Sequence, residues 1–230
     1  SIVGSTIDTN GGNFLGNGEG SVFGPGINVN NSTINAGGGK IDLNGIGGNA
    51  TGGNNVGIFI SGASTLQTTG GNITLNGTGG TKFPSFNEGI VVTGTSKVTS
   101  ANGNIALTGI GKGTGNDDDN NGININSTGA VESTGTGSIT FIGTGGNGID
   151  NNQGISINGN VLSVNGDITL TGTGNGSGDN NTGITIAGTV QSTGGKLTLN
   201  GVGGNGNNFN EGININFPGK VLSLNGDINL

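Results

Sequence analysis

The 230-residue chain contains no cysteine, methionine, histidine, tryptophan, tyrosine or arginine. Without histidine and cysteine there is no imidazole base, no thiolate nucleophile, no disulfide framework and no zinc site of the usual composition. These absences exclude most side-chain catalysis, so we expect no enzymatic activity and no organic cofactor. The absence of cysteine also suits a secreted protein, which must stay free of thiols during export.

Charged residues are scarce, and their balance is acidic. Six lysines stand against 13 aspartates and glutamates, which gives a net charge of -7. Nucleic-acid binding needs clustered cationic side chains, so we expect no nucleic-acid partner. No apolar run approaches the roughly 18 residues of a membrane-spanning helix, and we expect no membrane insertion. No export signal is visible at Ser1, so the sequence is expected to start after processing or inside a longer protein.

Hydrophobic residues make up only 28% of the chain, which also contains 56 glycines. Such a composition alone would suggest disorder. The apolar residues, however, alternate with polar ones inside short phrases, as in Ile73/Leu75 and Ile123/Ile125. Alternation with a period of two indicates strands with one buried face.

Three phrases recur in the same order about every 30 residues, and this periodicity is the strongest signal in the chain. A Val-x-Ser phrase begins at Val98, Val131, Val161, Val190 and Val221. A Gly-x-Ile-x-Leu-x-Gly-x-Gly phrase begins at Gly39, Gly71, Gly103, Gly137, Gly166 and Gly195. A Gly-Ile-x-Ile phrase begins at Gly57, Gly89, Gly122, Gly154, Gly183 and Gly212, with a looser copy at Gly26.

These strands are too short to pair usefully within their own repeat, so each must pair with its equivalent one repeat away. The sequence therefore predicts one all-β domain over residues 1–230, a right-handed parallel β-helix or β-solenoid. It has three short strands per coil and about seven coils of 29–34 residues. Equivalent apolar residues should stack in columns such as Leu75, Leu107, Phe141, Leu170 and Leu199, and a column of small residues from Ala36 to Ser223 should mark a tight corner.

Asparagine occupies the position two residues before Gly-Ile in six consecutive coils: Asn55, Asn87, Asn120, Asn152, Asn181 and Asn210. Stacked amides can donate and accept along the axis of the rod, and asparagine tolerates the left-handed backbone of a sharp corner. A ligand site would rarely be repeated in every coil. The sequence therefore predicts a structural asparagine ladder.

The segment between the second and third phrases varies from coil to coil, and repeat proteins often place their contact surface on such insertions. Stacking would bring their carboxylates into an acidic stripe, and oxygen-rich stripes can hold calcium. The alternative is a row of solvated loops whose charges provide solubility. The calcium prediction falls on Asp117, Asp118, Asp119, Asp150 and Asp179, and the wider stripe would add Glu88 and Glu211.

Two further features of the repeats have less specific interpretations. Phe83, Phe86 and Phe209 lie in the variable segments, where we expect them to cap the core locally. Threonines recur on the outward side of the second phrase, a pattern typical of β-sheet packing. An ice-binding face is a weaker alternative, because Asp42, Ala106 and the irregular coil length interrupt a regular lattice.

The phrases GNITLNGTGG and GININSTGAVEST resemble those of large secreted bacterial β-strand-repeat proteins, broadly the filamentous-haemagglutinin-like surface proteins. The resemblance covers essentially the whole chain. It implies a right-handed β-helix, export to the cell surface or extracellular matrix, and a passive role in adhesion or in building fibres. The secretion-domain segment Asn-Pro-Asn-Gly-Ile of such adhesins is absent from this sequence.

We therefore expect an extracellular structural and adhesive rod that associates end to end, with a cell surface or polysaccharide as a further partner. Both ends of the sequence fall within a coil, which would expose strand edges for this stacking. A calcium-dependent matrix protein is the first alternative. A polysaccharide-acting enzyme is the second alternative. Asp117–Asp119 together with Asp150 could supply its carboxylates, but the sequence has no arginine, histidine, tyrosine or tryptophan to bind or activate a substrate.

Overall fold

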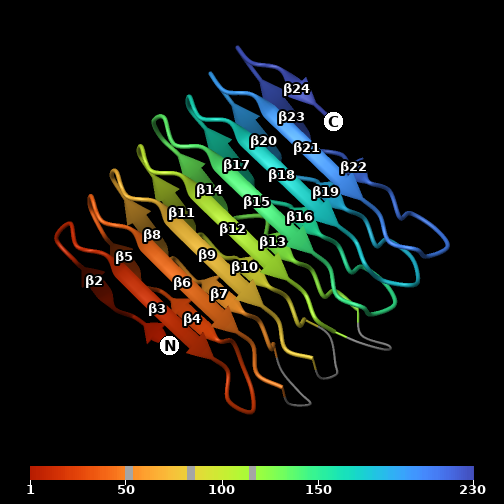
Figure 1. Ribbon diagram of the computed structural model, residues 1–230, viewed down its shortest axis with the longest axis horizontal. Helices are drawn as coiled ribbons and strands as arrows, with labels where there is room; N and C mark the ends of the chain where they lie inside the picture. The colour runs from red at the N-terminus through yellow and green to blue at the C-terminus, as the bar shows by residue number, and fades with distance from the viewer. Residues whose placement is uncertain (50–53, 82–85, 114–117) are drawn as a thin grey trace.

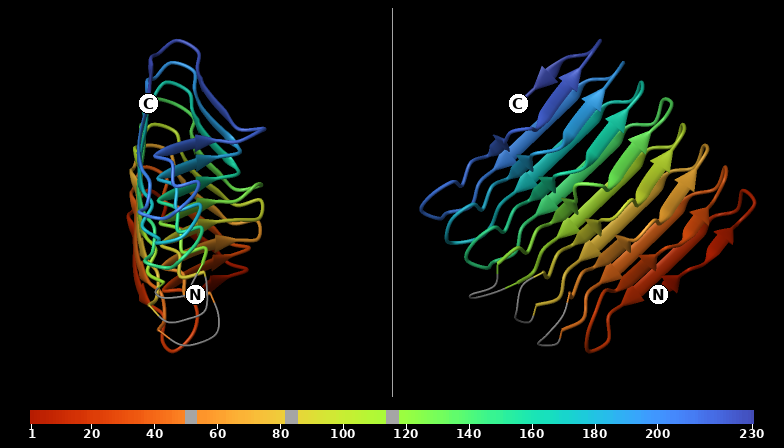
Figure 2. Two further views of the ribbon diagram at one scale, coloured as in Figure 1. Left: turned by 90° about the vertical axis from the view of Figure 1, so that its right-hand side faces the viewer. Right: turned by 180° about the vertical axis from the view of Figure 1, so that it is seen from behind.

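A computed structural model describes residues 1–49, 54–81, 86–113 and 118–230. These residues form a parallel β-solenoid of about 7 turns of about 31 residues, as the repeat predicts. The described elements are all strands, so none of them is a helix that could cross a membrane. The two termini lie at opposite ends of the stack (Figures 1 and 2).

Three eight-stranded parallel sheets form the walls of the solenoid. The first sheet contains β1 (Ile2–Val3), β4 (Ile27–Asn30), β7 (Ile58–Ser61), β10 (Ile90–Val92), β13 (Ile123–Ile125), β16 (Ile155–Ile157), β19 (Ile184–Ile186) and β22 (Ile213–Ile215). The second contains β2 (Thr6–Asp8), β5 (Thr33–Asn35), β8 (Thr65–Thr68), β11 (Lys97–Ser100), β14 (Ala130–Ser133), β17 (Asn160–Ser163), β20 (Thr189–Ser192) and β23 (Lys220–Ser223). The third, with the longest strands, contains β3 (Phe14–Glu19), β6 (Ile41–Ile46), β9 (Ile73–Thr78), β12 (Ile105–Ile110), β15 (Ile139–Thr144), β18 (Ile168–Thr173), β21 (Leu197–Val202) and β24 (Ile228–Asn229).

The register of the strands is constant from coil to coil. Each Ile of the Gly-Ile phrase pairs with the next, as Ile90 does with Ile58 and Ile123, and no pairing slips by a residue. Coils differ in length in the loops that connect the third sheet to the first sheet of the following coil and also in the turns between sheets: Val131 follows Ile123 by eight residues, whereas Val161 follows Ile155 by six. The described parts of the loops that connect the third sheet to the first lie side by side along one edge of the solenoid (Figure 1).

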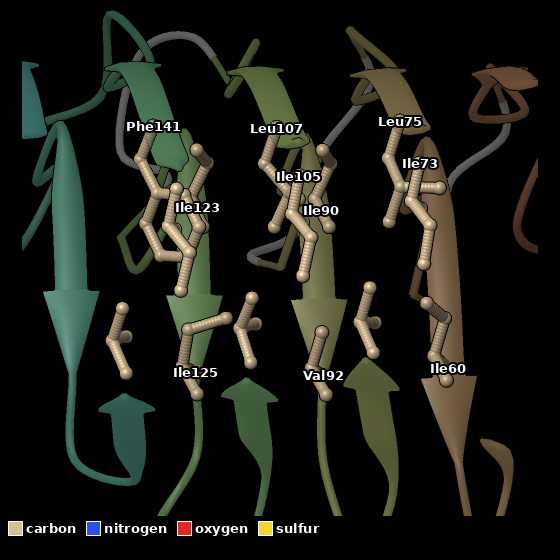
Figure 3. Close-up of a cluster of buried hydrophobic side chains, with 14 of the residues drawn as sticks. Ile60, Ile73, Leu75, Ile90, Val92, Ile105, Leu107, Ile123, Ile125 and Phe141 are labelled. Atoms are coloured by element: carbon tan, nitrogen blue, oxygen red, sulfur yellow. The ribbon is translucent and has the colours of Figure 1, made fainter. Parts of the chain in front are cut away.

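The core is a narrow file of stacked aliphatic side chains. Figure 3 shows Leu75, Leu107 and Phe141 following one another along the axis, with Val92 beside Ile125 in a second column. Phe141 replaces leucine in its coil and is completely buried. The predicted columns are confirmed, because period-two alternation fixes which side chains face inward and the parallel register stacks like on like.

The predicted column of small residues also lies inside the second sheet. Ser100 and Ser192 are fully buried, and the Oγ of Ser192 donates to the Gly166 carbonyl oxygen at 3.0 Å while accepting the Gly195 N–H at 2.9 Å. Each hydroxyl therefore ties its own turn to the preceding coil. Among the described residues, the equivalent hydroxyls of Ser133 and Ser163 have no hydrogen-bond partner, so this device is not repeated in every coil.

The threonine file lies on the outer face of the third sheet, where parallel register aligns Thr140, Thr169 and Thr198. Two further outward files run beside it, through Asn44 and Asn76 and through Thr144 and Thr173. The Nδ2 of Asn76 donates to the Oδ1 of Asn44 at 2.8 Å, which forms an exposed amide pair between coils. The irregular coil length does not disturb this face, since the extra residues lie in the loops and turns between strands.

Candidate functional site

The asparagine ladder runs along the edge where the loops leave the first sheet. Asn120 shows its bonding: its Oδ1 accepts from the Asn87 Nδ2 at 3.2 Å and from the Asn87 backbone N–H at 3.0 Å. Its own Nδ2 donates to the Asn152 Oδ1 at 2.9 Å. The first five ladder residues are completely buried, and Asn210 in the last coil is half-buried. The structural prediction is confirmed for Asn55, Asn87, Asn120, Asn152, Asn181 and Asn210.

The left-handed backbone conformation belongs to the residue before the ladder asparagine in the five coils from Asn87 to Asn210, and not to the ladder residue as we predicted. Asp119, Asn151 and Asn180 have φ angles of 58°, 56° and 57°. Asparagine and aspartate adopt this region readily, but Phe86 and Phe209 occupy the same position with φ of 66° and 53°. A bulky side chain in this region is uncommon, which makes these two positions worth examining.

The acidic residues separate into two columns. In the first, the Asp118 Oδ1 accepts the Asp150 backbone N–H at 3.0 Å, and the Asp150 Oδ1 accepts the Asp179 N–H at 2.7 Å. These carboxylates thus fasten one loop to the next. Glu88 and Glu211 lie in a second column, and each directly follows a ladder asparagine. Their backbone carbonyl oxygens accept from the N–H groups of Gly57 and Gly183, which begin the first-sheet phrase of the preceding coil.

Calcium binding by this stripe remains a prediction. Asp118, Asp119, Asp150 and Asp179 are described, whereas Asp117 lies outside the described residues. Within the described ranges, no group of three or more acidic side chains is arranged to hold a metal ion. The observed role of Asp118 and Asp150 is that of hydrogen-bond acceptors between coils.

Glu88 lies beside a groove that the sequence did not indicate. Its side chain is 5% exposed, and its Oε1 accepts from the Asn124 Nδ2 at 2.7 Å and from the Asn121 Nδ2 at 3.3 Å. Both amides come from the following coil, so stacking of β13 on β10 buries the carboxylate. The Oδ1 of Asn124 is also buried, and no hydrogen-bond partner for it exists among the described residues.

The groove itself has a volume of about 390 Å³ and opens on the outer face of the first sheet. Phe59 and Val91 form its floor, and Val91 lies between Phe59 and Asn124 in the strand register. Phe86 lies beside it and is 48% exposed, so it does not cap the core as predicted. Phe209 is 66% exposed, and Phe83 lies outside the described residues. The remaining lining residues are Asn54, Val56, Glu88, Thr93 and Asn126.

Burial raises the pKa of the Glu88 carboxyl from its ordinary value of 4.5 to about 7. The two amide donors of Asn124 and Asn121 oppose this rise, and the negative charge of Asp119 adds to it. Partial burial also raises the pKa of Asp119, and the charge of Asp118 contributes. Glu88 is therefore a carboxyl that changes charge near neutral pH.

This raised pKa predicts a pH-dependent stability. Between about pH 4.5 and pH 7 the folded protein holds a proton on Glu88 that the unfolded chain has lost. The free energy of unfolding should therefore fall as pH rises through this window, by about 3 kcal/mol in total. Glu88→Gln should remove this fall, and urea denaturation at pH 4.5 and 7.5 measures it. Glu211→Gln, at an exposed equivalent position, is the control; equal pH dependence in wild type and Glu88→Gln would contradict the assignment.

One sequence signal could have pointed to this groove. The pentapeptide Phe-Asn-Glu-Gly-Ile occurs twice, at residues 86–90 and 209–213. In both copies a phenylalanine occupies the left-handed position and a glutamate follows the ladder asparagine. Only the first copy is covered by a following coil in this structure, so only Glu88 is buried.

Comparison with known protein families, curated proteins and solved structures finds no match to this chain. The residues that carry the fold are therefore interpreted from their own geometry. The described features that can act on other molecules are the acidic loop column, the outer face of the third sheet and the groove at Glu88.

Proposed function

We propose that the chain is a non-enzymatic extracellular structural and adhesive protein that forms a rigid rod. The observation that supports this most directly is the unbroken register of all three sheets over every coil. Because neighbouring coils are joined by three parallel strand pairs, bending the stack would have to stretch hydrogen bonds on at least one wall. Such an element provides length and stiffness.

Side-chain ladders parallel to the axis reinforce this interpretation. Many buried amides, buried serines and loop carboxylates bond to the coil above or below, as in the Ser64 N–H donating to the Ser96 Oγ at 3.3 Å. Few of these groups point toward a common centre, as the parts of an active site would. The polar chemistry of the chain is thus used mainly to hold coils together.

A place among the haemagglutinin-like surface proteins, with secretion to the cell surface or matrix, is part of the same proposal. The β-solenoid fold and the absence of cysteine support it. The loop edge and the threonine-rich face of the third sheet would then serve as contact surfaces for a cell surface or an extracellular polysaccharide. A calcium-dependent form of this function would use the Asp118 column.

End-to-end association of copies is the proposed route to fibres. The columns of the second sheet continue to both described ends, so Val221 and Ile7 belong to one inward column. Among the described strands, β23 and β2 each pair on one side only. Stacking β2 of one copy on β23 of another would extend the ladder without changing its register.

Cryo-electron microscopy over a concentration series tests this proposal. We expect rods that lengthen with concentration and carry a repeat near 4.8 Å along their axis. Val221→Lys should block lengthening, because it places a charge in the core column at the stacking end, whereas Ile142→Lys on the exposed outer face should not. Short particles of fixed length at every concentration would contradict association, and fibres that dissolve in chelator would assign calcium a structural role.

A further inference from the structure

Among the described residues, the buried carboxyl of Glu88 has no cationic partner. The described lysines that form ion pairs are Lys40, with Asp42 at 3.6 Å, and Lys97, with Glu132 at 3.2 Å. From the described part of the chain, Glu88 receives two neutral amide donors, both from the next coil. A buried carboxylate is costly unless it is paired, so this group is well suited to a ligand that brings a positive charge.

The other walls of the groove favour the same kind of ligand. The Oδ1 of Asn124 is buried and lacks a donor among the described residues, so it offers a second acceptor beside Glu88. Phe59 and Phe86 line the groove with aromatic rings, whose faces attract cations. A volume of about 390 Å³ lies within the usual range of small-ligand pockets, about 300–1,000 Å³.

We propose that this groove binds an organic ammonium group, with Glu88 as its counter-ion, Asn124 as a hydrogen-bond acceptor and Phe59 and Phe86 as its aromatic walls. A primary ammonium supplies up to three N–H donors to the two acceptors and presents its carbon chain to the rings. The two natural sources with this chemistry are a lysine side chain of another protein and an amino sugar of a glycan. The proposal does not depend on assembly of the rod.

Other ligand classes fit these residues less well. An anion would face a carboxylate that no cation accompanies among the described residues. A divalent metal ion prefers several oxygen ligands of fixed geometry, and the described residues contain no group of three acidic side chains arranged for one. A neutral sugar could stack on the phenylalanines but would leave the charge of Glu88 uncompensated.

The test is calorimetric titration of the full chain with two pairs of probes. Methyl glucosaminide is compared with its N-acetyl derivative, and Nα-acetyl-lysine methylamide with its Nε-acetyl derivative. In each pair acetylation converts the ammonium group into a neutral amide. We expect at least one charged probe to bind about tenfold or more tightly than its acetylated partner, and the one that does so identifies the source as glycan or protein. Equal binding within both pairs, or binding of neither charged probe, would overturn the proposal.

Variants locate the binding within the molecule. Glu88→Gln should weaken the charged probe about tenfold or more, while Glu211→Gln, in the second copy of the pentapeptide, should leave it unchanged. Circular dichroism confirms that each variant is folded, and Phe59→Leu provides a second variant that keeps the carboxylate but weakens a ring contact. Loss in Glu211→Gln with retention in Glu88→Gln would place the site elsewhere and contradict the proposal.

Two further measurements separate ligand binding from properties of the chain itself. Affinity should rise between pH 5 and pH 7, where both charged probes keep their ammonium group, because Glu88 must be ionised, with Asp119 as the other acid that affects its charge. A pH-independent affinity would contradict the role of Glu88. Lys82→Gln should bind as the wild type does; binding that appears only in this variant would show that the chain's own lysine competes for the groove, and an external ligand would be excluded.

Discussion

Asn120→Ala is expected to lower the free energy of unfolding by about 4 kcal/mol. The substitution leaves three buried polar groups without their partner: the backbone N–H and Nδ2 of Asn87 and the Oδ1 of Asn152. Each orphaned group costs about 1–3 kcal/mol, and relaxation of the cavity would recover part of the sum. Guanidinium denaturation followed by circular dichroism measures the change.

Asn76→Ala is the matched control for this loss. Asn76 forms the same kind of amide bond between coils, donating to Asn44 at 2.8 Å, but on the exposed face of the third sheet. Water can replace that bond, so we expect a change below about 1 kcal/mol. Equal effects of the two alanine substitutions would show that burial of the ladder contributes nothing, and would contradict its assignment as the main polar support of the stack.

Gly109→Ala is the second substitution with a large expected effect, about 4 kcal/mol or a failure to fold. Gly109 lies in the middle of β12, where a side-chain Cβ would overlap the carbonyl oxygen of Gly122, at the entrance to β13. That oxygen accepts a hydrogen bond from the Ile90 N–H at 3.0 Å, which holds it in the first sheet. To admit the Cβ, either the first or the third sheet must shift. Overpacking of a rigid core is costly because the neighbours cannot relax.

Gly70→Ala separates this steric effect from the general loss of a glycine. A Cβ at Gly70 meets no atom within 4 Å, and the residue is exposed in a turn. Thermal or chemical denaturation should show a change within about 0.5 kcal/mol of zero, or a small gain from a less flexible unfolded chain. A stable, wild-type-like Gly109→Ala would mean that the first and third sheets do not approach as closely as the structure shows.

The architecture could be predicted from the sequence because the same weak local pattern recurs in each coil. The alternation at Ile73/Leu75 specifies little by itself, but its recurrence in each coil fixes both the inward face and the partner strand. The ladder could be predicted for the same reason. Asn87 alone is one asparagine among many, but Asn120 and Asn152 occupy the same position of the repeat in the next two coils. Periodicity thus determines what is common to all coils.

Features that do not recur from coil to coil could not be predicted in this way. The groove at Glu88 is lined by Phe59, Val91 and Asn124, which come from three different strands. Their spacing in the sequence does not indicate that these outward side chains line one groove. The burial of Glu88 likewise depends on which amides the next coil happens to carry. The stripe containing Glu88 and Asp118 was expected as one feature, because a sequence count of loop positions does not distinguish two neighbouring columns.

Distances between spin labels along one file test the central claim, a straight stack of coils, most directly. The chain has no cysteine, so pairs can be introduced without background: Asn44→Cys together with Asn76→Cys, Ile142→Cys or Asn200→Cys, all at exposed positions of the third sheet. These pairs are separated by one, three and five coils in the strand register. The account predicts narrow distributions whose centres increase by about 4.8 Å per coil, or close to 24 Å between the backbones of the outermost pair. Broad distributions, or centres that do not increase with the number of coils, would contradict it.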